Sequence, residues 1–215
     1  MSVKALLFDL DGVLVDLMAL HEEAFLAAVR TEGKVDLGVV EHQAHYAGRS
    51  TKQKLQMLVD IGLITREQVS KIAACKQRLT QTYIEQRCTP DTQRLALLQH
   101  LWGADYKLGC VTNCIKTTTY EVLRRTQLLP FLEECIVTNE DVKFPKPSPE
   151  PYQHACGLLE LPPAEVLVFE DHPLGMESAF KAGCHVQQVH TFPELTVDFV
   201  WATIEETNAL IKGTA

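Results

Sequence analysis

Residues 3–16 read VKALLFDLDGVLVD, and the rest of the chain is best interpreted from this stretch. Its apolar part, residues 5–8, has the length and composition of a buried strand. Two aspartates one residue apart, Asp9 and Asp11, follow directly, and then Gly12. Two carboxylates this close repel each other and are costly to desolvate unless a cation or hydrogen-bond donors surround them. The pair therefore indicates a chemical role for the end of this strand.

Four later apolar runs resemble the first one, at 107–111, 135–137, 166–169 and 185–189. Most of the intervals between them carry apolar residues at three- and four-residue spacing, which is typical of helices. Strands that alternate with helices indicate a parallel sheet covered on both faces. We therefore expect a doubly wound α/β core.

The interval from residue 16 to about residue 89 breaks this alternation, because no strand pattern occurs in it. Glycines separate helical stretches that are expected at 21–30, 41–46, 51–58 and 66–86. We predict an all-helical inserted domain over 17–89, and a core domain made of 1–16 and 90–215. If the insertion moves as a lid, the two chain crossings between the domains are its hinges.

Composition excludes several classes of protein. The 215 residues include 20 basic and 28 acidic side chains, a formal net charge of −8, so no basic surface for nucleic acid or anionic membranes is expected. No apolar stretch reaches about 18 residues and no leader pattern precedes the first strand, so we expect a cytoplasmic protein, with a monomer as the default state. Seven cysteines without a Cys-x-x-Cys pair argue against a disulfide framework and a zinc knuckle.

Polar residues follow four of the expected strands. Ligands of an open parallel sheet bind beyond the carboxyl ends of its strands, so these residues are expected to share one site. They are Asp9 with Asp11, Thr112 with Asn113, Lys146 in the loop after the third strand, and Glu170 with Asp171. A set of acids, a hydroxyl and an ammonium suits phosphoryl transfer.

The chemistry of such a site follows from its residue types. Mg²⁺ prefers hard oxygen ligands, which Asp9, a backbone carbonyl and Asp171 provide. A carboxylate can attack phosphorus when a metal offsets the repulsion between the two anions, and a second carboxylate can protonate the departing oxygen and then activate water. Thr112 and an ammonium would hold the phosphoryl oxygens. The ammonium is assigned to Lys146, with Lys143 as the alternative.

Four segments, taken in order, resemble the motifs of the haloacid dehalogenase superfamily. They are DLDGVLVD at 9–16, VTN at 111–113, KPSP at 146–149 and FED at 169–171, and the resemblance runs from residue 5 to about residue 189. It implies a Rossmann-like core, a helical cap inserted after the first motif, and a Mg²⁺-dependent reaction on a small phosphorylated metabolite.

The resemblance also implies a role for each matching residue. Asp9 becomes the nucleophile and Asp11 the acid/base. Phosphate binding is assigned to Thr112, Asn113 and Lys146, and the metal to Asp9, Asp11, Glu170 and Asp171. In the insertion, His21 follows shortly after the first motif, at a position where related phosphosugar mutases also have a histidine. Arg49 is a candidate for a second anionic group of the substrate, although the same segment also suits a helix start capped by Ser50 or Thr51.

Three reactions compete within this resemblance. Members that cleave carbon–halogen bonds lack the second aspartate, so Asp11 favours phosphate chemistry. Members resembling β-phosphoglucomutase have threonine or serine at the position of Leu17 and lysine at that of Ala47, so a phosphatase is favoured, with the mutase as the alternative. A phosphate-binding module without turnover is a further alternative, but it would not need Asp11.

Other polar residues have simpler interpretations. His172 either contacts the site or caps the helix that Pro173 begins. The remaining candidates are expected on the solvated surface of the insertion: His42, His45, Lys52 and Lys54.

Overall fold

The computed structural model of the protein describes residues 2–46 and 49–213. The chain divides into two compact units, with the divisions between Asp16 and Leu17 and between Cys88 and Thr89. We call the unit that contains both chain ends the core unit, and the unit over Leu17–Cys88 the helical unit. None of the described helices is both long enough and apolar enough to cross a membrane.

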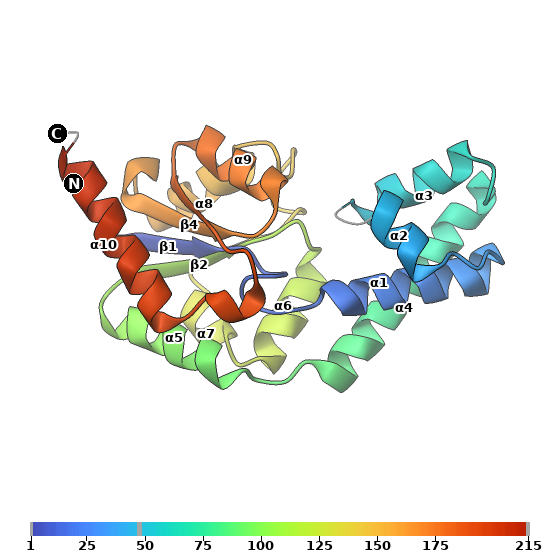
Figure 1. Cartoon of the computed structure of the whole chain (residues 1–215), viewed down its shortest axis with the longest axis horizontal. Coiled ribbons are helices and arrows are strands. Elements are labelled where there is room, and N and C mark those ends of the chain that lie inside the picture. The colour runs from blue at the N-terminus through green and yellow to red at the C-terminus, as the bar shows by residue number, and fades with distance from the viewer. Residues whose placement is uncertain (1, 47–48, 214–215) are drawn as a thin grey trace. The chain divides into compact units, whose positions relative to one another are not determined.

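Five parallel strands form the sheet of the core unit, in the order β3-β2-β1-β4-β5 (Figure 1). The strands are β1 (Ala5–Phe8), β2 (Lys107–Val111), β3 (Ile136–Val137), β4 (Val166–Glu170) and β5 (His185–Gln188). The predicted doubly wound parallel sheet is therefore confirmed. Three bounds differ from the prediction, because β3 begins at Ile136, β4 extends to Glu170 and β5 ends at Gln188.

Helices cover both faces of this sheet (Figure 1). Leu7 and Val168 pack with α8 (Glu150–Leu159) and α9 (Pro173–Ala182) in one buried cluster. On the other face Phe8 stacks on Phe169, with ring centroids 5.3 Å apart, and Phe169 meets Phe199 of the last helix. Burial on both faces explains why β1 and β4 are continuous apolar runs rather than alternating ones. The remaining elements of the core unit are α5 (Thr92–Gly103), α6 (Lys116–Arg125), α7 (Leu129–Leu132), η2 (Pro163–Glu165), η3 (Phe192–Glu194) and α10 (Val197–Gly213).

The helix starts near the sheet follow from local sequence. Asp91 caps α5, since its side chain accepts a hydrogen bond from the Arg94 backbone N–H at 2.8 Å. His172 caps α9, because its Nδ1 accepts a hydrogen bond from the Leu174 backbone N–H at 3.2 Å, and Pro173 occupies the first turn. Of the two interpretations of His172, the structure shows the cap.

The helical unit contains four α-helices and, over its described residues, no strand, as the sequence predicts. They are α1 (Met18–Ala28), α2 (Val39–His45), α3 (Thr51–Asp60) and α4 (Arg66–Arg87), with a π-helical turn at Val29–Gly33. Phe25, Leu55, Leu58 and Ile72 are fully buried and form the centre of its own hydrophobic core. Ser50 caps α3 through a capping box with Gln53.

Candidate active site

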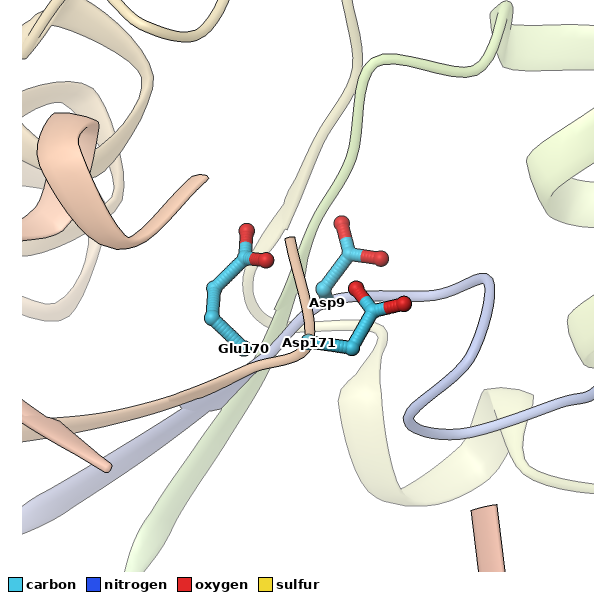
Figure 2. Close-up of side chains that lie close together, drawn as sticks. All are labelled: Asp9, Glu170 and Asp171. Atoms are coloured by element: carbon cyan, nitrogen blue, oxygen red, sulfur yellow. The ribbon is translucent and has the colours of Figure 1, made fainter. Parts of the chain in front are cut away.

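Three carboxylates converge beyond the carboxyl ends of β1 and β4 (Figure 2). Asp9 follows β1, Glu170 ends β4 and Asp171 comes next; an oxygen from each lies within 4.8 Å of the others. Strand pairing brings them together, because Phe8 is in register with Phe169 and the Asp9 backbone N–H donates to the Phe169 carbonyl at 3.0 Å. Among the described residues Asp11 does not belong to this group, because it lies two positions further on, in the turn that follows β1.

Lys146 is the cation of this cluster. Its Nζ donates to Asp9 Oδ1 at 2.6 Å, to Glu170 Oε1 at 2.5 Å and to the Val111 carbonyl at 2.7 Å. The Lys146 side chain is only 4% exposed. Lys143, the alternative, instead places its Nζ over the exposed Phe144 ring, 5.1 Å from the centroid.

Burial and charge shift the pKa values of these groups strongly. Burial raises the pKa of Asp9 to about 8; Lys146 acts in the opposite direction and Glu170 adds to the rise. Burial also works against a charged Lys146, but the carboxylates of Asp9 and Glu170 outweigh it and hold the lysine pKa well above its ordinary value. The pKa of Asp171 is raised by burial and by Glu170. With three acids and one ammonium, the cluster has an excess of negative charge that a further cation would relieve.

The donor set fits a divalent cation. Three carboxylates with oxygens within 4.8 Å of one another are hard ligands of the kind that Mg²⁺ takes. Two glycines leave room for these acids. A Cβ at Gly12, whose φ is +93°, would overlap the Asp171 carboxylate, and a Cβ at Gly175 in the first turn of α9 would overlap that of Glu170. The close approach therefore depends on residues without a side chain.

Two residues support Lys146 and Glu170. The Tyr152 hydroxyl donates to Glu170 Oε1 at 2.8 Å, and Lys146 Nζ lies 5.1 Å from the centroid of the Tyr152 ring. Asn113 pairs with the backbone of Lys146, donating from Nδ2 to its carbonyl at 3.3 Å and accepting from its N–H at 3.1 Å. The sequence does not identify Tyr152 as a site residue, because a tyrosine on an amphipathic helix has the pattern of an ordinary residue of the hydrophobic core.

Thr112 is the remaining polar residue of the predicted site at this edge of the sheet. It is 3% exposed, its backbone N–H donates to the Val137 carbonyl at 2.9 Å, and its Oγ1 accepts from the Cys114 N–H at 3.1 Å. These bonds hold the hydroxyl directly after β2. Asp9, Thr112, Lys146, Glu170 and Asp171 thus all lie at the carboxyl edge of the sheet, where the sequence places them.

His21 and Arg49 are the two candidate substrate-binding residues in the helical unit. Burial, and then the charges of Lys76 and Lys54, lower the pKa of His21 to about 3; its Nδ1 lies 3.3 Å from Lys76 Nζ. Arg49 is exposed and donates from Nε to the His45 carbonyl at 3.3 Å. Ala47, which bears on the mutase alternative, lies outside the described residues, as does Gly48.

The expectation that His42 and Lys54 lie on a solvated surface is wrong. His42 is 3% exposed, with Nδ1 2.8 Å from Glu22 Oε1 and Nε2 3.0 Å from Lys54 Nζ. Lys54 is half-buried and lies over the Phe25 ring, 5.1 Å from its centroid. Three helices contribute to this cluster, so helical spacing within any one of them does not reveal it.

Lys54 makes the stability of the folded protein change with pH in the alkaline range. Burial lowers the pKa of Lys54 to about 8; the charge of Lys76 adds to this and Glu22 opposes it. The folded state therefore binds fewer protons than the unfolded state, and its stability rises as the pH increases from about 8 towards the ordinary lysine pKa of 10.5. We expect wild type to gain melting temperature between pH 8 and pH 10 relative to Lys54→Met. Thermal unfolding followed by circular dichroism measures this.

The exposed neighbour Lys52 provides the control on the same helix. Lys52→Met should keep the pH dependence of wild type. A pH dependence that persists unchanged in Lys54→Met would contradict the assignment.

A family model described as haloacid dehalogenase-like hydrolase matches residues 6–189 of the chain. This match covers all five strands except Ala5, the first residue of β1, and it includes the three carboxylates and Lys146. It agrees with the family resemblance of the four sequence motifs.

Several known proteins are similar over most of their length. Hexitol phosphatase A of Escherichia coli is 34% identical, over 96% of this chain and 94% of the relative. Phosphoglycolate phosphatase of Nitrosospira multiformis is 26% identical, over 86% and 82%. The crystal structure of β-phosphoglucomutase from Clostridium difficile shares the fold with a TM-score of 0.77 at 19% identity, covering 95% of this chain and 98% of that one.

Proposed function

The chain belongs to the haloacid dehalogenase-like hydrolases, and within that family we propose that it is a phosphatase that hydrolyses phosphoric monoesters of small metabolites. The observation that carries this proposal is the convergence of Asp9, Glu170 and Asp171 around one site with Lys146. The hexitol and phosphoglycolate phosphatases among the relatives support the reaction class and suggest substrates to test first.

Asp9 is the proposed nucleophile. It lies at the end of β1 with its side chain only 13% exposed, and Lys146 Nζ holds Oδ1 at 2.6 Å, which orients the carboxylate. Attack on phosphorus forms an aspartyl-phosphate and releases the alcohol of the substrate. Asp11, in the adjoining turn, protonates the departing oxygen and then takes a proton from the water that hydrolyses the intermediate. Thr112 and Lys146 bind the phosphoryl oxygens as negative charge develops on them.

Mg²⁺ is the proposed cofactor, held by Asp9 and Asp171 with Glu170 at or beside it. When bound, it supplies positive charge that screens the phosphate from the carboxylates and keeps Asp9 ionised. The raised pKa of Asp9 in the protein alone supports this assignment, because a neutral aspartic acid is a poor nucleophile.

The helical unit is the proposed cap; it ends at Cys88, one residue before the end of the insertion predicted at 17–89. A cap that closes over the substrate would exclude bulk water during transfer and reopen for release of product. His21 and Arg49 are its proposed substrate-binding residues.

The proposal is tested by assaying phosphate release from hexitol phosphates, phosphoglycolate and an aryl phosphate, with Mg²⁺ and with excess EDTA. We expect turnover of at least one of them with Mg²⁺ and a loss of more than about 100-fold in EDTA that added Mg²⁺ restores. Activity unchanged in EDTA would contradict the metal assignment. Conversion of a phosphosugar to its isomer without phosphate release would instead indicate the mutase alternative.

A further inference from the structure

Arg94 is a buried arginine of the core unit that has no role in the reaction proposed above. It lies in the first turn of α5 and is 1% exposed. Arginine is seldom fully buried, since desolvating its charge is costly unless good acceptors surround it. Its guanidinium donates to backbone carbonyls that come from two other parts of the core unit.

The three carbonyls lie in the segments that follow β1 and β5. Nε donates to the Val13 carbonyl at 3.0 Å, while the two terminal nitrogens donate to the carbonyls of Leu195 and Phe192. The guanidinium also lies over the Phe192 ring, 4.2 Å from its centroid. Arg94 therefore ties the segment after β1 to the segment that follows β5.

The segment after β1 is the one that carries Asp11. Its turn is closed by backbone bonds from Leu14 and Val15 to the Leu10 carbonyl, at 3.0 and 2.9 Å, and from Gly12 to the Val15 carbonyl at 2.7 Å. Val13 lies at the tip of this turn, two residues beyond Asp11, and is fully buried. The bond from Arg94 thus restrains the tip of the turn from outside the turn itself.

We propose that Arg94 is a positioning residue for Asp11: by holding the Val13 carbonyl it keeps the turn at the angle that aims Asp11 at the leaving oxygen of the substrate. This inference rests on the proposed function, because Asp11 is the proton donor there. The guanidinium reaches the three carbonyls from three separate nitrogens, whereas the donors of a lysine ammonium share a single nitrogen, so lysine cannot reproduce this geometry. Small displacements of a group that transfers a proton reduce rates steeply.

The leaving group of the substrate separates positioning from general stability. An alkyl phosphate has a poor leaving group that needs protonation by Asp11, whereas an aryl phosphate has a good one that needs it much less. For Arg94→Met and Arg94→Lys we expect kcat/KM, which reports departure of the leaving group and not the later hydrolysis of the shared aspartyl-phosphate, to fall about 30-fold on an alkyl phosphate and only about 3-fold on an aryl phosphate.

Two further variants make the result decisive. Leu98→Ala lies on the same helix at a fully buried position, so it destabilises the core unit without removing a bond to the turn, and both substrates should slow equally. Equal loss on both substrates in the two Arg94 variants, as in Leu98→Ala, would overturn the positioning role. Asp11→Asn must show the same selective loss on alkyl phosphate, and if it does not, it is the proposed acid/base role that fails.

Discussion

Replacing Asp9 by asparagine is expected to abolish phosphate release, lowering kcat by roughly 10⁴-fold or more. The amide cannot attack phosphorus as a carboxylate does, so no aspartyl-phosphate forms. The substitution is conservative in structure, because the side-chain oxygen still accepts a hydrogen bond from Lys146, which lies 2.6 Å from Asp9 Oδ1. Steady-state assays on alkyl and aryl phosphates measure the loss, and thermal unfolding shows whether the variant is folded.

A matched control is Asp105→Asn. Asp105 is an exposed aspartate of the core unit, just before β2 at the amino edge of the sheet, and its φ of 63° is one that asparagine adopts readily. It removes one carboxylate from the same unit and should leave kcat within about 2-fold of wild type. An Asp9→Asn variant that is folded and keeps more than about 1% of wild-type turnover would exclude Asp9 as the nucleophile.

Replacing Lys146 by methionine should both inactivate and destabilise the protein. The ammonium is the shared partner of Asp9 and Glu170, and removing one member of a buried ion pair typically costs about 3 kcal/mol or more of unfolding free energy. Protonation of Asp9, whose pKa is already raised, recovers part of that loss. We expect kcat to fall by about 10³-fold, because the cation that orients Asp9 and binds phosphoryl oxygens is gone.

Lys143→Met is the natural control, because it removes the same charge three residues away. Lys143 packs on the exposed Phe144, so its loss should change the unfolding free energy by less than about 0.5 kcal/mol and leave kcat unchanged. Denaturant unfolding and steady-state assays compare the two variants directly. If Lys143→Met inactivates and Lys146→Met does not, the assignment of the phosphate-binding lysine is reversed.

Much of the core unit could be predicted because its signals are local. The apolar run at 5–8 is a central strand, buried on both faces, and it needs no partner in the sequence to be identified. Pro173 and Asp91 mark helix starts through backbone geometry and side-chain capping that act over a few residues. The edge of the sheet then collects whatever follows each parallel strand, so Asp9, Thr112 and Asp171 could be assigned to one site.

Features that depend on contacts between distant segments could not be predicted in this way. His42 was expected in solvent, yet Glu22 from one helix and Lys54 from another enclose it. Arg94 looks like an ordinary polar residue of an amphipathic helix, and its role depends on carbonyls about 80 and 100 residues away. Neither periodicity nor motif spacing carries that information.

The order of strands and polar residues along the chain was enough to predict the parallel sheet and the residue types at its carboxyl edge, because backbone pairing and burial follow from local composition. The pairing of charges was decided by the tertiary structure: Lys146 lies between Asp9 and Glu170, Tyr152 bonds to Glu170, and Gly175 leaves the space that this carboxylate needs. Electrostatic interactions and close packing depend on distances of a few ångströms between segments far apart in sequence, and only the folded chain defines those distances.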